Sequence, residues 1–224
     1  LKKDLSKKKN LILKAKLKDV PRDLLINQIY SDIKIEKKKY LKNNLNFKNI
    51  SNVISELFYI TANALSTQSI YSLSNFYVNL AKYLNQNFYS YDTLLAENFV
   101  MIGDYQKAIK IYTTLKKIGE IYSWHSSKQI AMLKIEKLKT KEAIITMEKS
   151  FRNLKSPNLY QTYDFAQFLK NNEKFKQSIK YYSKVIKNIS ITHELYPKAK
   201  DGRGIAYEQP NNWTKAEKDF LDSL

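Results

Sequence analysis

The chain has 224 residues, a formal net charge of +18, 43% hydrophobic residues, and only 4 glycines and 4 prolines. This hydrophobic content is sufficient for a packed core, and the shortage of glycine and proline leaves few of the tight turns that sheets need. There is no cysteine, which excludes disulfides, thiolate nucleophiles and Cys-ligated metal sites. We therefore predict an all-α protein.

The first segment, residues 1–50, carries much of the positive charge, with 15 Lys/Arg against 5 Asp/Glu. Its spacing predicts one or two helices from a degenerate upstream repeat, followed by a basic linker near residues 43–49. The charge has two interpretations that the sequence leaves open. It reflects either solvated lysines in a chain rich in Lys, Asn, Ile and Tyr, or a real anionic partner such as a nucleic acid.

From residue 51 onward, small residues recur in pairs at a constant separation of twelve positions. Small residues let two antiparallel helices approach closely, and a period of this length is typical of arrays of helical hairpins. The later member of each pair stands at 74, 108, 143, 178 and 216, with differences of 34, 35, 35 and 38. The pairs are Ala62 with Ser74, Ala96 with Ala108, Ala131 with Ala143, Ala166 with Ser178, and Gly204 with Ala216.

This register predicts ten helices with turns at Gly103–Asp104 and around Asn211. We expect Trp124 and Trp213 in the core of their repeats and Asp219 on an exposed helix face. The predicted helices cover residues 53–66, 70–85, 89–102, 105–118, 124–138, 140–153, 158–171, 175–188, 194–208 and 213–224.

No arrangement of residues suited to catalysis is evident. The only histidines, His125 and His193, stand far apart and have no carboxylate at a useful helical spacing. The glycines lack the spacing of a phosphate-binding loop, and the acidic residues are scattered. We predict no catalytic residue, no metal site and no cofactor, and therefore a protein that is not an enzyme.

Two segments, residues 94–112 and 202–220, share one pattern of small and aromatic residues. The first contains GDYQKAIKIY and the second NNWTKAEKDF. The shared positions are Ala96, Phe99, Ala108 and Tyr112 in the first segment, and Gly204, Tyr207, Ala216 and Phe220 in the second. The pattern resembles the tetratricopeptide repeat, and the order of segments from Glu56–Leu65 to Arg203–Phe220 resembles bacterial, particularly alphaproteobacterial, multi-repeat proteins.

The resemblance covers residues 51–224 and implies about five hairpins, the last one truncated, in a right-handed superhelical solenoid. The first helices of such a solenoid line a concave groove. For Tyr160 and Tyr163, two alternatives remain open, namely contact with a ligand and packing against the neighbouring hairpin. The candidate peptide-binding residues implied are Tyr59, Asn63, Thr93, Glu97, Lys128, Met132, Tyr160, Tyr163 and Gln167.

The resulting hypothesis is a non-enzymatic scaffold or adaptor that binds a partner protein or peptide in the groove. The alternatives are an RNA-binding array of helical hairpins, or the repeat region of a larger envelope assembly factor or enzyme. No apolar run is long enough for a transmembrane helix. The ends at Leu1 and Leu224 indicate an internal fragment whose N-terminus is missing, and either a cytoplasmic or a bacterial envelope location fits.

Overall fold

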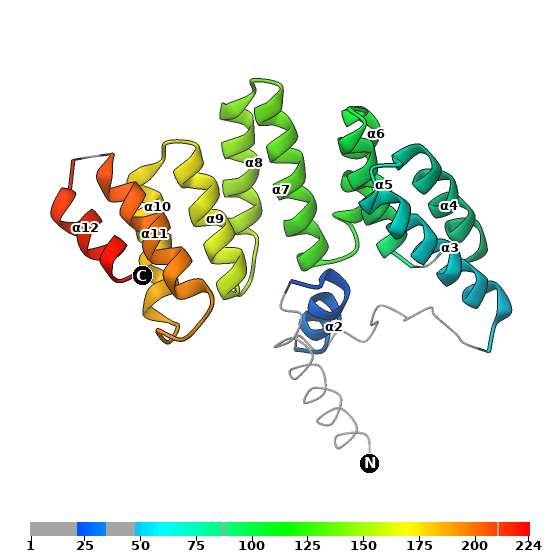
Figure 1. The fold of residues 1–224 in the computed structure, drawn as a ribbon, viewed down its shortest axis with the longest axis horizontal. Coiled ribbons are helices and arrows are strands. Elements are labelled where there is room, and N and C mark those ends of the chain that lie inside the picture. Colours follow the sequence, from blue (N-terminus) through cyan, green and yellow to red (C-terminus); the bar gives the residue numbers. More distant parts are fainter. Residues whose placement is uncertain (1–21, 35–47, 87, 210) are drawn as a thin grey trace, which may run out of the picture. The chain divides into compact units, whose positions relative to one another are not determined.

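The computed structural model describes residues 22–34, 48–86, 88–209 and 211–224. Within these ranges the chain forms eleven helices and no strand (Figure 1), so the predicted all-α class is confirmed. The chain divides into two compact units, unit 1 (residues 1–133) and unit 2 (residues 134–224). The predicted linker near residues 43–49 lies almost wholly outside the described residues.

Within the two units, α3 and α4, α5 and α6, α9 and α10, and α11 and α12 pair as antiparallel hairpins (Figure 1). The helix bounds follow the predicted ranges closely. The largest difference is at Glu120, where a helix begins four residues before the predicted residue 124. One further helix lies inside the segment 1–50. The helices are α2 (Leu24–Lys34), α3 (Ile50–Thr67), α4 (Tyr71–Leu84), α5 (Ser90–Met101), α6 (Tyr105–Leu115), α7 (Glu120–Glu136), α8 (Thr140–Arg152), α9 (Leu159–Asn171), α10 (Phe175–Lys187), α11 (Leu195–Glu208) and α12 (Trp213–Leu221).

The predicted pairs of small residues are buried throughout the array. Where the second-helix member is serine, its hydroxyl crosses to the first helix. Ser74 Oγ donates to the carbonyl of Ala62 at 2.8 Å, and Ser178 Oγ donates to that of Ala166 at 2.9 Å. Such bonds require backbones in close approach, which only small side chains at these positions permit. The hairpin register predicted from the sequence is confirmed.

The turns of the hairpins share one backbone feature that the sequence predicted only in part. Each contains a residue in the left-handed region, five positions before the second-helix small residue. Glycine adopts this conformation freely, whereas other residues do so at a cost of about 1 kcal/mol or more. The five residues are Ser69 (φ 63°), Gly103 (φ 79°), Leu138 (φ 57°), Glu173 (φ 60°) and Asn211 (φ 61°).

Unit 1 contains two apolar clusters, one centred on α3 to α5 and one on α5 to α7. Leu24 of α2 packs against the second cluster. Gln28 of α2 accepts a hydrogen bond from the backbone N–H of Ile121 at 2.9 Å and donates to Asp32 at 2.9 Å. A Cβ on Gly119 would lie 2.2 Å from the Gln28 side chain. Helix α2 therefore satisfies a free backbone donor at the start of α7.

Unit 2 ends in a buried ion cluster, and here one expectation is wrong. Asp219 does not lie on an exposed face but is 3% exposed. It binds Arg203 through two bonds of 2.6 and 2.8 Å and Lys200 at 3.1 Å, because both cations project from α11 toward α12. Lys200 also binds Asp222 at 2.6 Å. The ion cluster, defined by these four residues, ties the last two helices together.

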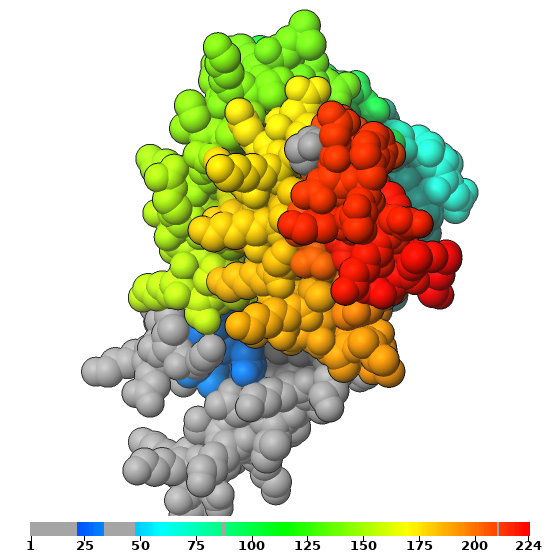
Figure 2. All heavy atoms as spheres, turned by 90° about the vertical axis from the view of Figure 1, so that its left-hand side faces the viewer, coloured from blue at the N-terminus to red at the C-terminus, as the bar shows by residue number. Residues whose placement is uncertain are grey.

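The two tryptophans differ from each other. Trp124 is 5% exposed and lies in the core as predicted, whereas Trp213 is 59% exposed because it begins the last helix, where no described helix covers it. The surface of α10 is basic, and its side chains project outward in a row, drawn yellow to orange in Figure 2. Four exposed lysines lie along this helix, namely Lys176, Lys180, Lys184 and Lys187.

Candidate functional site

The predicted groove residues of α3 and α5 meet around one phenol. The side chains of Asn63 and Ser90 lie close to the Tyr59 phenol, and the carboxylates of Glu56 and Glu97 are near enough to act on it electrostatically. The Asn63 side-chain N–H itself donates to the backbone carbonyl of Tyr59 at 2.9 Å. The pKa of Tyr59 is raised, mainly by burial, with the Asn63 and Ser90 side chains opposing the increase and the two carboxylates adding to it. We call these five residues the Tyr59 cluster.

The ring of Tyr59 is held by aromatic neighbours from the start of α5. Its centroid lies 5.9 Å from that of Phe88 and 5.0 Å from that of Tyr91. Tyr91 is itself fully buried, and its hydroxyl bonds to Ser55 Oγ at 3.0 Å. These contacts hold the Tyr59 ring between α3 and the start of α5.

A buried polar network fixes α3 against α5 nearby. Asn98 of α5 is 0% exposed, and it donates to Ser74 Oγ at 2.7 Å and to Asn75 Oδ1 at 2.9 Å. It also accepts a bond of 2.7 Å from Ser66 Oγ. Removing one member would leave buried polar groups without partners. The sequence offered a signal for this network, since Asn98 stands where the other repeats carry Ala, Leu or Phe.

The two carboxylates of the Tyr59 cluster lack a cation. Neither Glu56 nor Glu97 makes a hydrogen bond or ion pair with any residue in the described ranges, and the Oε2 atom of Glu56 is buried. Desolvation raises the pKa of both groups above the ordinary 4.5, but only Glu56 is half-buried, whereas Glu97 is an exposed residue. The neighbouring Asp92, in contrast, is paired with Lys82.

The other candidates in unit 1 are placed differently. The Thr93 hydroxyl donates to the carbonyl of Tyr89 at 3.3 Å, so it serves its own helix. Lys128 is half-buried and Met132 is 53% exposed, both on α7. Met132 is therefore an exposed apolar side chain on the next first helix along the chain.

In unit 2 the three candidates do not gather at one point. Tyr163 is 8% exposed and packs edge-on against Tyr182 at 5.8 Å, so its ring belongs to the core. The Tyr160 hydroxyl donates to Glu194 Oε1 at 2.7 Å, which joins α9 to the start of α11. Gln167 is exposed. Tyr163 thus packs inside its own hairpin, and Tyr160 bonds to the start of the next one.

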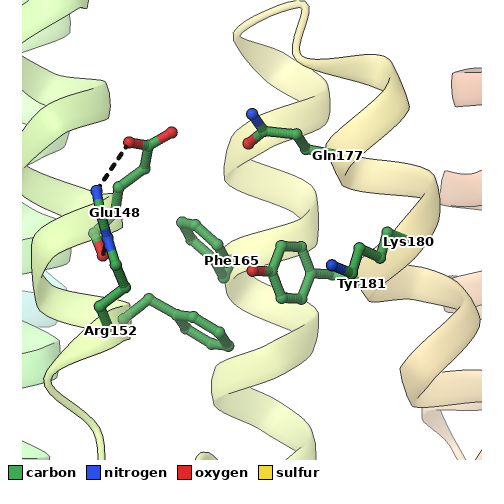
Figure 3. A pocket seen from close by; sticks show the side chains of 7 residues that line it. Glu148, Arg152, Phe165, Gln177, Lys180 and Tyr181 are labelled. Carbon is green, nitrogen blue, oxygen red and sulfur yellow. Dashed lines mark hydrogen bonds and ion pairs between the residues drawn. The ribbon is translucent and has the colours of Figure 1, made fainter.

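A pocket in unit 2 was missed by the sequence analysis. It has a volume of about 390 Å³ and lies among α8, α9 and α10 (Figure 3). Phe151 and Phe165 stack with centroids 4.3 Å apart, and Tyr181 meets Phe165 edge-on at 4.9 Å. Glu148 and Arg152, 3.3 Å apart, form one side of the mouth. Because most of its lining comes from the second helices α8 and α10, the repeat pattern of groove positions on first helices does not indicate it.

No group of three or more His, Cys, Asp or Glu side chains in the described ranges could hold a metal ion. Among the same residues, no helix combines the length and apolar character needed to cross a membrane.

Comparison with known proteins gives matches at the level of structure only. No family model and no curated protein matches the sequence. A crystal structure of MamA is 15% identical, with 76% of this chain and 90% of that chain covered and a TM-score of 0.54. MamA 41-end from Desulfovibrio magneticus RS-1 is 12% identical, with 75% and 92% covered and a TM-score of 0.53. YrrB, described as a TPR protein with an unusual peptide-binding site, is 14% identical, with 74% and 82% covered and a TM-score of 0.49.

At these identities the likeness concerns the fold alone. The hairpin period, the buried pairs of small residues and the match to MamA agree with one another. Together they show that this chain has the fold of the tetratricopeptide-repeat proteins.

Proposed function

We propose that this chain is a non-enzymatic adaptor that holds a segment of a partner protein against α3 and α5 of unit 1. The observation that carries the proposal is the Tyr59 cluster. It gathers a phenol, an amide, a hydroxyl and two carboxylates from two successive first helices. Arrays of this kind work by presenting such a surface to a partner.

The chemistry of the cluster suits recognition rather than catalysis. A tyrosine held by neighbouring rings offers contact area and a hydrogen-bonding tip at a low entropic cost, because few of its rotatable bonds remain to be ordered. The Asn63 side-chain N–H donates to the Tyr59 carbonyl at 2.9 Å, and its Oδ1 offers an acceptor for a backbone N–H of an extended peptide. The exposed Met132 on α7 adds an adaptable apolar contact.

Charge favours a protein partner over RNA at this surface. Between Asn49 and Gln106 the chain holds a single basic residue, Lys82, which is paired with Asp92. RNA binding needs cations to neutralise phosphates, and α3 and α5 supply none. The exposed lysines of α10 make nucleic-acid binding elsewhere a separate outcome to be recorded.

The test is selection of a displayed random peptide library on the whole chain, at physiological salt and after nuclease treatment. Selected peptides are then measured by fluorescence anisotropy against two variants. Tyr59→Phe removes only the hydroxyl and keeps the ring contacts, and we expect at least a fivefold loss of affinity. Tyr83→Ala is the matched control, because Tyr83 is 80% exposed on the second helix α4.

Two results would overturn the proposal. One is a set of selected peptides that bind wild type and the Tyr59→Phe variant equally. The other is hydrogen-exchange protection by those peptides at the α8–α10 pocket with none at α3 and α5. Retention of only nuclease-sensitive material from a lysate would favour the nucleic-acid alternative.

A further inference from the structure

We infer that the segment bound at the Tyr59 cluster is basic, and that an arginine or lysine side chain of the partner lies against Glu56 and Glu97. This inference rests on the proposed function, since it names the chemistry of the partner at the same surface. It follows from a local shortage of positive charge, from two carboxylates without a cation, and from an aromatic ring near both of them.

The shortage of positive charge is confined to one part of the chain. The whole sequence has 39 Lys/Arg in 224 residues, and at that density about ten would be expected between Asn49 and Gln106. One is present, Lys82, against the four acidic residues Glu56, Asp92, Glu97 and Asp104. The stretch that forms α3, α4 and α5 is thus acidic within a strongly basic protein.

The few cations near this stretch are already used. Lys82 is paired with Asp92, and Lys107 binds the Asp104 carboxylate at 2.7 Å. Lys107 also lies 5.2 Å from the centre of the Phe99 ring. Glu56 and Glu97 are the acidic residues of the stretch that make no ion pair within the described ranges.

An unpaired carboxylate that is partly removed from water is unfavourable in the free protein. The buried Oε2 of Glu56 illustrates this cost, since no described group donates to it. A guanidinium or ammonium group placed there would supply the missing charge-assisted hydrogen bonds. The half-buried Tyr59 ring lies near both carboxylates and provides an aromatic neighbour for such a cation.

The net charge of the protein makes this inference easy to distinguish from non-specific attraction. A chain of +18 repels basic peptides and attracts acidic ones at long range. At physiological salt that effect decays over about 8 Å, so a preference for basic peptides has to come from local contacts. The sign of the preference is therefore informative by itself.

The experiment uses the whole chain and fluorescein-labelled decapeptide probes measured by anisotropy. One series carries two arginines separated by two to six residues, and matched series carry citrulline or glutamate at the same positions. We expect arginine probes to bind at least tenfold more tightly than citrulline probes. We also expect the double variant E56Q/E97Q to lose at least tenfold in affinity for arginine probes only.

The control is the double variant E142Q/E217Q, which changes the net charge by the same amount. Glu142 and Glu217 are exposed and lie on the second helices α8 and α12. This variant should bind all probes as the wild type does. Circular dichroism before titration checks that both double variants are folded.

Failure of the inference and failure of the proposed function give different results. Peptides that depend on the Tyr59 hydroxyl, but lack basic residues and bind E56Q/E97Q normally, would overturn this inference and leave the adaptor proposal in place. Loss of arginine-probe binding in E142Q/E217Q as well would mean that net charge governs binding, and would also overturn the inference. Selected peptides that ignore Tyr59 would overturn both.

Discussion

Carboxylates in the two units have opposite surroundings. In unit 2, Asp219 is 3% exposed and has Arg203 and Lys200 within 3.1 Å. In unit 1, Glu56 is half-buried and Glu97 is exposed, and no described cation meets either of them. A carboxylate thus has its cationic partners within the fold in unit 2, whereas two carboxylates of unit 1 have none among the described residues.

The difference separates residues that stabilise from residues available for binding. Removal of a buried carboxylate whose partners are all present lowers the free energy of unfolding. Such a carboxylate has few hydrogen-bonding positions left for a ligand. A desolvated carboxylate without a cation lowers stability, and proteins retain such groups mainly at functional sites. The comparison therefore predicts opposite effects of substitution in the two units.

The largest effect is expected for Asp219→Ala. Removal of this carboxylate leaves Arg203 without its two bonds and Lys200 with only Asp222. We expect a loss of about 3–5 kcal/mol in the free energy of unfolding, as found when one partner of a buried ion pair is removed. Urea denaturation followed by circular dichroism measures it. The control Glu217→Ala, an exposed acid on the same helix, should change stability by less than about 0.5 kcal/mol. Equal effects of the two substitutions would contradict the stabilising role of the Asp219 ion pairs.

A second test of the closed packing in unit 2 is Gly202→Ala. The added Cβ would lie 2.5 Å from the Tyr182 ring, which is 1% exposed and has little room to move. Overpacking of this kind costs about 1–3 kcal/mol, and the better helix propensity of alanine returns about 1 kcal/mol. We expect a net loss of up to about 2 kcal/mol in the free energy of unfolding, measured by thermal or urea denaturation. A more stable variant would show that this region is less tightly packed than described.

A substitution at a turn should stabilise unit 2 without changing a residue of the ion cluster or of the Tyr59 cluster. Leu138 is 93% exposed and has a φ of 57°, so its side chain contributes no packing and its backbone is strained. Leu138→Gly should raise the free energy of unfolding by about 1 kcal/mol. Gly103→Ala in the equivalent turn of unit 1 should have the opposite effect, since Gly103 has a φ of 79°. An unchanged midpoint for both variants would contradict the account of the turns.

The repeat register could be predicted because small residues recur at a fixed offset, and they are buried where two helices adjacent in the sequence pack together. The turn conformation was predictable at Gly103 and Asn211, which are typical turn formers, but not at Leu138 or Glu173. There the geometry is imposed by the two helices that the turn connects, and the local sequence does not favour it.

The candidate site shows the same limit. The positions of Tyr59, Asn63 and Glu97 followed from the resemblance to the repeat family, but which of them meet around one phenol depends on side-chain packing. Asp219 was placed on an exposed face because an acid near a helix end usually is exposed. Its burial depends on Lys200 and Arg203, which come from the preceding helix and cannot be paired with it from local spacing.

The smallest effect, and the one that bears most directly on the comparison, concerns pH. A carboxyl whose pKa is higher in the folded than in the unfolded chain binds protons more readily when folded, so ionisation of Glu56 and Glu97 disfavours the fold above their raised pKa.

The variant E56Q/E97Q cannot ionise at these two positions. At neutral pH it should be as stable as the wild type or more stable, by no more than about 0.5 kcal/mol per site. The difference should vanish below the ordinary pKa of 4.5, where both carboxyls are neutral in either state. Effects of the other acids cancel, because wild type and variant share them. Urea denaturation of both proteins from neutral pH down to pH 4 checks this. A variant less stable at neutral pH would mean that the two carboxylates, like Asp219, hold the fold together.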